Sequence, residues 1–296
     1  MFRLFIVFVF FTTLDLILYG IPLFSTDSDA RLDRRSIYYF LLVQFSQLLC
    51  YVCAYHFAFY KKVTKFHLIV MLFLVAYNIL LVSRGIIVHF VLFWCIAYLL
   101  ISDINLWRKL FVISITSLLM LILFGVAGDL RQGGEFKIKE YGAFIVELPS
   151  FLYWLYGYVV INLDNLVLIL RENLTSEYSK ILVNFSPRIY SFFGEVPTDY
   201  DTLPYVGRFN LPTGFGLILY EFHYSVTFLF IFILSVFVKR SIRQLKGNFY
   251  NSFVSAYIIM GYFLLPVKNI FITKEFWIAV IIVSILRKFF SKLFAR

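Results

Sequence analysis

Long uninterrupted runs of apolar residues constrain the fold of this chain more than any other feature. The first run, FRLFIVFVFFTTLDLILYGIPLF, covers residues 2–24, and similar runs recur toward the C-terminus. A run of about 20 residues crosses the hydrocarbon core of a bilayer as a helix, which satisfies its own backbone hydrogen bonds where water is absent. The runs do not show the short alternating segments of a transmembrane β-barrel. The chain is therefore expected to be an all-α integral membrane protein.

Eight runs are expected to cross the membrane, at residues 2–24, 37–60, 66–82, 85–101, 110–127, 216–238, 250–270 and 274–290. The composition also indicates a membrane protein, because 61% of the residues are hydrophobic and 15% are charged, whereas soluble domains are roughly 45–50% apolar. The first run is too long, and has too few small residues at its end, to be a cleaved signal peptide. Residues 1–296 are expected to form a single polytopic membrane domain.

Lysine and arginine in the short loops predict the orientation of the chain. Four basic segments fall on one side of this topology: KKVTK (61–65), WRK (107–109), KRSIRQLK (239–246) and the tail RKFFSKLFAR. The loop STDSDARLDRRS opposes them, and its three arginines are accompanied by three aspartates. Both termini are therefore expected in the cytoplasm, and residues 128–215 outside it as a long segment with interfacial helices. Two extra spans within 141–170 would preserve the same topology.

The net charge of +10 is explained by these basic loops, which anchor spans against anionic headgroups. No nucleic-acid partner is expected. Cys50 and Cys53 have the spacing of zinc ligands, but they lie in an apolar run and no second pair of Cys or His completes the set. The sequence contains no phosphate-binding loop, dinucleotide-binding motif or serine-hydrolase elbow. No metal and no cofactor are therefore expected.

Polar and ionisable residues interrupt the outer ends of several predicted spans. They are Asp15, Asn78, Arg84, His89, Asp129, Arg131, Glu221 and His223. Because such groups are costly in lipid and face a bundle interior or a watery cavity, their coincidence predicts an extracytoplasmic cavity. Simpler interpretations stay open: Arg84 can extend to the headgroups, Asp15 can make a packing hydrogen bond, and Gln44 and Gln47 can join neighbouring spans.

Three stretches together resemble the Wzy-type O-antigen polymerases, which polymerise the oligosaccharide repeat units of bacterial surface polysaccharides. The stretches are SRGIIVHFVLFWCIAYLL, WLYGYVVINLDNLVLIL and RFNLPTGFGLILYEFHYSVTFLFIFILS, and the resemblance covers roughly residues 66–290. Members commonly carry a tyrosine-rich stretch that ends in Asn-Leu, which Tyr156, Tyr158, Asn162 and Leu163 resemble.

Members then show an Asn and a Thr shortly before a span that opens Tyr-x-Asp-Phe-Gly, and Asn210, Thr213 and LYEFHY stand in those places. Glu221 takes the acidic position, whereas His223 replaces the usual glycine. Arg131 and Gly142 also fit an arginine–glycine spacing described for some members.

The resemblance implies a glycosyltransferase of the bacterial cytoplasmic (inner) membrane that acts at the extracytoplasmic face in lipopolysaccharide biosynthesis. Its substrates would be undecaprenyl-diphosphate-linked glycans, and a chain-length regulator and a flippase in the same membrane would be its partners. A lipid-linked oligosaccharide flippase or exporter and an O-antigen ligase are the alternatives.

Each candidate residue has an expected role in this chemistry. Glu221 is the first choice for the general base, with Asp129 or His223 in reserve. Arginines would stabilise the departing diphosphate. The candidates for catalysis are Glu221, Arg84, Arg131 and Asp129, and those for substrate binding are Arg208, Asn210, His223, Asn162 and Asp15. Glu221 and His223 lie about 200° apart on a continuous helix, so both can face one atom only if the helix is distorted.

Overall fold

The computed structural model describes residues 2–21, 37–60, 64–81, 84–132, 148–149, 152–153, 156, 160, 162–171, 215–222, 224–265 and 270–291. Every regular element in these ranges is a helix. The chain divides into two compact units, Met1–Leu155 (unit 1) and Tyr156–Arg296 (unit 2). Each unit is described by itself.

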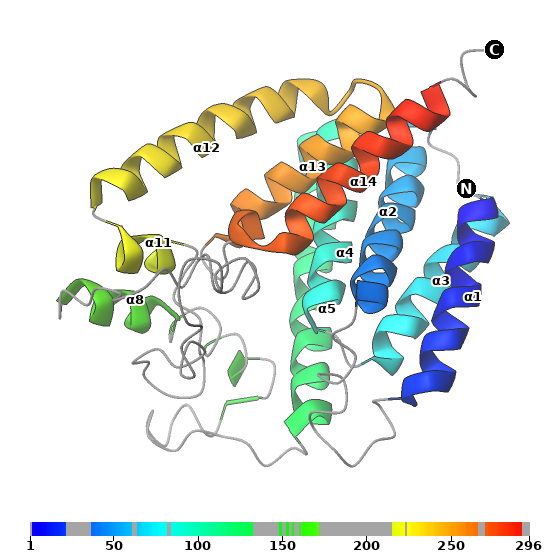
Figure 1. Ribbon diagram of the computed structural model, residues 1–296, viewed down its shortest axis with the longest axis horizontal. Helices are drawn as coiled ribbons and strands as arrows, with labels where there is room; N and C mark the ends of the chain where they lie inside the picture. Colours follow the sequence, from blue (N-terminus) through cyan, green and yellow to red (C-terminus); the bar gives the residue numbers. More distant parts are fainter. Residues whose placement is uncertain are drawn as a thin grey trace, which may run out of the picture. The chain divides into compact units, whose positions relative to one another are not determined.

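The described part of unit 1 is built from apolar helices (Figure 1). They are α1 (Phe2–Tyr19), α2 (Ile37–Tyr60), α3 (Lys65–Leu80), α4 (Arg84–Ile96), the π-helical continuation η2 (Ala97–Ile101) and α5 (Leu106–Gln132). The second predicted span, 37–60, coincides with α2.

Side-chain contacts fix the directions of the first three helices. Phe2 packs on Phe66 with ring centroids 5.6 Å apart, and further along Phe8 packs on Tyr77 at 5.7 Å, so α1 and α3 run the same way. The ring of His56, near the end of α2, lies 4.4 Å from that of His67, near the start of α3. Helix α2 therefore runs opposite to both, as expected for successive spans joined by short loops.

An apolar core joins α1, α2, α3 and α4. Phe8, Leu49, Leu74 and Phe90 are buried in it, together with Cys50, Cys53 and Tyr77 of the same cluster. The ends of these helices have local causes. Gly20 follows α1 with a φ of +74°, a left-handed conformation that glycine adopts without strain. Thr64 caps α3 by accepting a hydrogen bond from the backbone N–H of His67.

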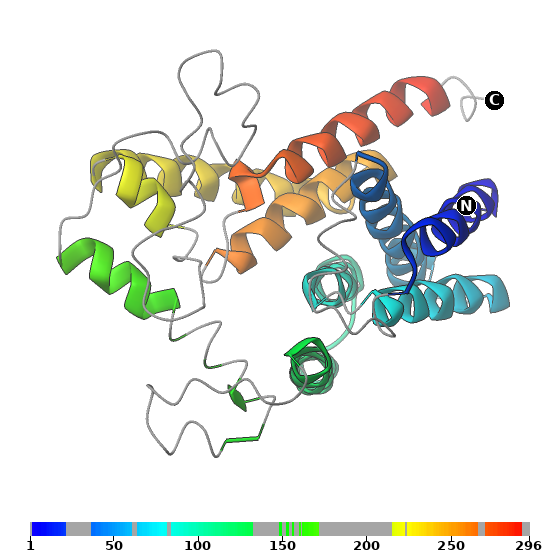
Figure 2. The ribbon, with the colours of Figure 1, turned by 60° about the horizontal axis from the view of Figure 1, so that its bottom comes forward.

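The described part of unit 2 contains α8 (Asn162–Arg171), α11 (Gly216–Glu221), α12 (Tyr224–Gln244), α13 (Phe249–Leu264), the 3₁₀ turn η5 (Ile270–Ile272) and α14 (Lys274–Ser291). Figures 1 and 2 show α14 alongside α13, and the two helices are in contact. Tyr257 of α13 stacks on Phe276 of α14, with ring centroids 5.3 Å apart.

Helices α12 and α13 pack as a hairpin around a short turn. The side chain of Asn248 caps α13 by accepting from the Asn251 N–H at 3.0 Å, and the Ser252 hydroxyl donates to the Leu245 carbonyl at 2.6 Å. Further along α13, a Cβ added at Gly261 would lie 2.6 Å from Cζ of Phe271. A glycine at this position therefore lets η5 pack close to α13.

Three described helices are long and apolar enough to cross a membrane: Phe2–Tyr19, Leu42–Tyr60 and Tyr224–Gln244. Shorter apolar helices lie at Lys65–Leu80, Val88–Ile101, Phe249–Leu264 and Phe276–Ile285. Large apolar side chains are exposed along the first and the last of the long helices, among them Phe10, Ile17, Phe228 and Phe232. An exposed apolar surface on an apolar helix is typical of a protein in lipid. The described fold is thus that of an all-α membrane protein, and the total of eight spans stays a prediction.

Several predicted boundaries are wrong. The first helix ends at Tyr19 rather than 24 because Gly20 terminates it, and α13 ends at Leu264 rather than 270, two residues before Pro266 in the sequence. Helix α5 is longer than expected at both ends. The largest error concerns 216–238, which is not one helix but two, with the break directly after Glu221.

Candidate functional site

In unit 2, the predicted span 216–238 is interrupted directly after Glu221, the residue expected to act as the general base. Helix α11 ends at Glu221, and Phe222 has an extended backbone with φ −128° and ψ 159°. The Phe222 N–H donates to the Ile218 carbonyl at 2.8 Å and so closes α11. Helix α12 begins two residues later at Tyr224. The predicted span 216–238 is therefore not a continuous helix, and the separation of about 200° expected for one does not apply at this point.

One further helix, α8, packs beside this interruption. Helix α8 packs against α11, and α11 packs against the start of α12 (Figure 2). Tyr220 is buried and Glu221 is partly buried, whereas Phe222 is 47% exposed. In the first turn of α12, Thr227 is also buried. The break thus holds a carboxylate partly withdrawn from solvent, directly after the buried Tyr220.

Asn165 is a buried polar residue of α8, the helix that packs on this break, and the sequence pattern singled out Asn162 instead. Asn162 is the first residue of α8, and the position of its side chain is not described. Asn165 is fully buried and shares a helix face with buried Ile169, one turn later. The signal in the sequence was its spacing of four residues from Ile169, which places an amide on the apolar face of a short helix.

Unit 1 contains a second group of buried polar side chains, located in the half of the bundle where α1 and α3 end. Asp15 of α1 is fully buried, and Tyr77 Oη of α3 donates to its Oδ2 at 3.3 Å. Asn78, the next residue, is also fully buried and donates from Nδ2 to the Leu74 carbonyl at 2.7 Å. Burial with a hydrogen bond fits the packing interpretation of Asp15, because a buried carboxylate requires donors.

The hydrogen bond between Gln47 and His89 joins α2 to α4. Gln47 Nε2 donates to His89 Nδ1 at 2.7 Å, and Gln47 is 1% exposed. The prediction that Gln47 joins neighbouring helices is confirmed. Gln44, one turn earlier, is buried as well, but its amide oxygen and nitrogen find no hydrogen-bond partner among the described residues.

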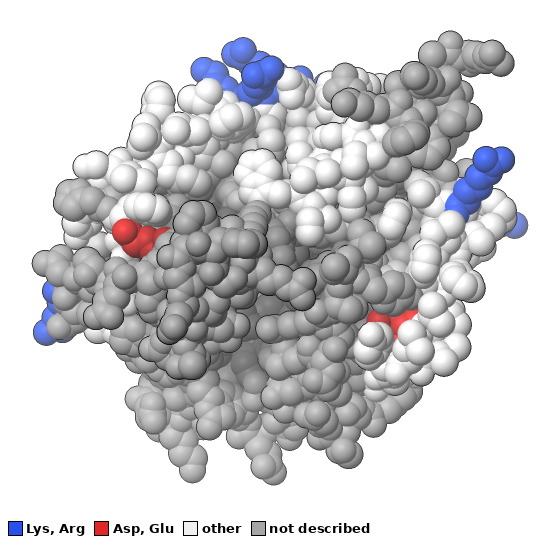
Figure 3. All heavy atoms as spheres, viewed as in Figure 1, with Lys and Arg blue, Asp and Glu red and all other residues white. Residues whose placement is uncertain are grey.

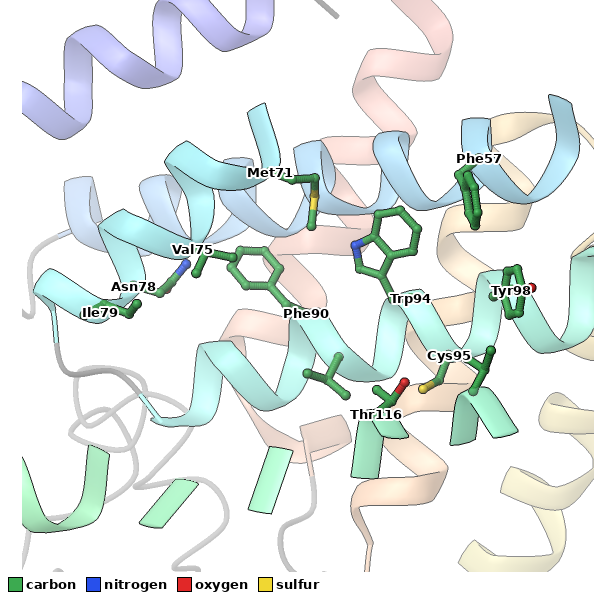
Figure 4. Close-up of a pocket in the computed structure, with 12 residues that line it drawn as sticks. Phe57, Met71, Val75, Asn78, Ile79, Phe90, Trp94, Cys95, Tyr98 and Thr116 are labelled. Carbon is green, nitrogen blue, oxygen red and sulfur yellow. The ribbon is translucent and has the colours of Figure 1, made fainter. Parts of the chain in front are cut away.

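An apolar pocket of about 460 Å³ lies between α2, α3, α4 and α5 (Figure 4). Its walls are aliphatic and aromatic, with Asn78 at one end and Phe57 and Tyr98 toward the other. From Phe90 to Tyr98 the wall extends about 12 Å along the helix axis. The remaining lining residues include Met71, Val75, Trp94, Cys95, Val112 and Thr116. The volume falls in the usual range for a ligand site, and the lining suits a hydrocarbon chain.

The candidate residues of the sequence are divided between the two units. Asp15, Arg84, Asp129 and Arg131 belong to unit 1, where Arg84 begins α4 and Asp129 and Arg131 lie in the last turn of α5. Glu221 and Asn162 belong to unit 2. Arg208, Asn210 and His223 lie outside the described residues. The gathering of all these residues around one cavity stays a prediction.

Comparisons with known proteins add no family and no fold relative. No protein-family model, curated protein or solved structure matches this chain. Within the described residues, no group of three or more His, Cys, Asp or Glu is arranged to hold a metal ion. A function is therefore inferred from the residues and their surroundings.

Proposed function

We propose that this chain is a glycosyltransferase that polymerises undecaprenyl-diphosphate-linked oligosaccharide repeat units at the extracytoplasmic face of a bacterial cytoplasmic membrane. The observation that carries the proposal is the helix interruption at Glu221. Non-helical backbone at the end of a membrane helix is tolerated where it is buried in protein or lines a watery cavity. A carboxylate at such a break is therefore available to a polar glycan rather than exposed to lipid.

The reaction assigns one task to this carboxylate. A hydroxyl at the non-reducing end of one lipid-linked repeat unit attacks the anomeric carbon of the growing glycan, and the bond from that carbon to the diphosphate carrier breaks. Glu221 accepts the hydroxyl proton, and undecaprenyl diphosphate leaves with the electron pair of the broken bond. Fixed guanidinium groups stabilise the charge that develops on the diphosphate, and the candidates are Arg84, Arg131 and Arg208.

The apolar pocket of unit 1 supports a lipid-linked substrate. A polyprenyl carrier needs a hydrocarbon-lined space beside the bundle, and the pocket between α2, α3, α4 and α5 offers one of about 460 Å³. A flippase or a ligase for the same carrier would use such a pocket too. The pocket therefore argues for the carrier, and the chemistry at Glu221 argues for glycosyl transfer rather than flipping.

The test is performed in cells that make O-antigen with this chain. The wild-type protein is replaced with Glu221→Gln, and lipopolysaccharide is resolved by length. A polymerase defect leaves single repeat units on the lipopolysaccharide core, because flipping and ligation are carried out by other proteins. Loss of all repeat units from the outer face would instead indicate a flippase. Accumulation of long unligated chains would indicate a ligase.

A further inference from the structure

The C-terminal end of α12 concentrates basic side chains on one short stretch of helix. Lys239, Arg240 and Arg243 lie there, and Lys246 follows in the turn to α13. Figure 3 shows lysine and arginine side chains gathered over this end of the helix. The sequence alone explains them as general anchors for anionic headgroups, and the structure adds a groove that two of them line.

A groove of about 320 Å³ runs along this stretch between α12 and α13. Ser235, Lys239 and Arg243 follow one another at intervals of four residues, so they form a single stripe on α12. Val238 and Ile242 line the adjacent stripe, and Tyr262 of α13 forms the opposite side. Arg240 and Lys246 do not line the groove, although they carry the same charge.

The basic and apolar stripes of the groove run side by side near the C-terminal end of α12. Helix α12 is long and apolar enough to cross a membrane, so its last turns lie where a helix of about 30 Å leaves the hydrocarbon. Arg243 and Lys239 are in those turns, whereas Ser235 lies one to two turns deeper. Beyond Ser235 the helix exposes Phe228 and Phe232, whose surface suits acyl chains. The groove therefore extends from the membrane interface toward the bilayer interior.

We propose that this groove binds an anionic phospholipid of the surrounding leaflet. The Lys239 ammonium and the Arg243 guanidinium hold the phosphate, for which charge-assisted hydrogen bonds and the planar donors of arginine are well suited. One acyl chain lies along Val238, Ile242 and the ring of Tyr262, which is 40% exposed. A soluble phosphate would use only the basic stripe and leave the apolar stripe uncovered. This site is independent of the glycosyltransferase function.

The test measures lipid binding to the purified full-length protein in nanodiscs of phosphatidylcholine that contain graded amounts of phosphatidylglycerol. The groove variant is Lys239→Gln with Arg243→Gln. The matched control is Arg240→Gln with Lys246→Gln, which removes the same charge from the same end of the helix outside the groove. Phosphatidylglycerol affinity should fall at least about tenfold in the groove variant, since each lost charge-assisted contact weakens binding several-fold. The control should change it by less than about threefold.

Two further arms distinguish a lipid site from a phosphate site and from diffuse attraction by surface charge. Ile242→Ser should weaken phosphatidylglycerol binding while leaving any retention of inorganic phosphate unchanged, because it alters only the apolar wall. Equal loss in the groove variant and the control would show surface electrostatics without a site and would overturn the proposal. Displacement of the lipid by millimolar inorganic phosphate, or equal binding of phosphatidylcholine, would also overturn it.

Discussion

At the scale of single residues, two carboxylates have different surroundings. Asp15 is fully buried in α1 and receives a hydrogen bond from Tyr77, which is the environment of a structural group. Glu221 is partly buried at the end of a six-residue helix, beside an extended residue. Only the second environment combines a carboxylate with access for a substrate. Asp15 therefore fits a packing role, and Glu221 stays the first choice for the base.

Glu221→Gln should abolish polymerisation while the protein remains in the membrane at its normal level. The amide keeps the size and a hydrogen-bonding capacity of the side chain but is no base, so proton removal from the attacking hydroxyl fails. Immunoblots of membrane fractions and the length distribution of the polysaccharide provide the measurement. His223→Gly, which introduces the residue usual at that place in the resembling family, is the control and should be tolerated. Full activity in Glu221→Gln, with loss only in His223→Gly, would reverse the assignment.

Arg84→Ala should lower the rate of polymerisation by roughly 30- to 900-fold. Removing one donor that stabilises charge in a transition state costs about 2–4 kcal/mol, and the diphosphate gains charge as the sugar departs. Arg84→Lys keeps the charge without the planar fork and should recover part of the activity. Initial rates with lipid-linked substrate measure both variants. Normal rates in Arg84→Ala would support the simpler interpretation, in which this side chain only reaches the headgroups.

At the scale of helices, two buried glutamines of α2 differ in their hydrogen bonding. Gln47 donates to His89 across the α2 and α4 interface, whereas Gln44 makes no hydrogen bond with the described residues. Gln47→Leu should lower stability by about 0.5–1.5 kcal/mol, a typical value for hydrogen bonds between membrane helices. Gln44→Leu should be neutral or stabilising, because it removes a buried amide that lacks partners. Thermal unfolding in detergent compares the two, and an equal loss would contradict the structure.

Helix positions were largely predictable from apolar run length, whereas helix interruptions were not. The run 37–60 became α2 without correction, because nothing in it opposes a helix. The run 216–238 became two helices, although no proline or glycine stands between Glu221 and Tyr224. A hydropathy window averages over such a break, since leucine, isoleucine and phenylalanine residues around it keep the mean hydropathy high. The packing of α8 against α11 is a long-range contact that no local pattern encodes.

The candidate site was predictable only as a set of residue types at the ends of spans. Spacing indicated that Gln47 joins helices, and the structure gives its partner as His89. The burial of Asn165 depends on which face of α8 meets its neighbours, so the sequence favoured Asn162 instead. The apolar pocket lined by Phe90 and Trp94 could not be foreseen, because a cavity is a property of packed helices and not of any one run.

At the scale of the whole molecule, the membrane topology determines on which side the proposed active face lies. Contacts within unit 1 show that α2 runs opposite to α1 and α3, so the end of α2, which precedes the basic segment 61–65, lies beside the start of α3 and at the same end as the start of α1. The count of lysine and arginine in the loops predicts that reporter fusions near Lys62, Arg243 and the C-terminus report cytoplasm, and fusions near Arg131 and Pro197 the opposite side. A cytoplasmic signal at Pro197 would remove the proposed active face.

The central claim is that this one chain joins lipid-linked repeat units, and the most direct measurement uses the purified protein. The full-length protein in nanodiscs is mixed with undecaprenyl-diphosphate-linked repeat units, without nucleotide or added metal, and the products are resolved by length. We predict a ladder of glycans that each carry one lipid diphosphate, with free undecaprenyl diphosphate released at every step, and no ladder from Glu221→Gln. Unchanged substrate with folded wild-type protein, or an equal ladder from Glu221→Gln, would contradict the claim.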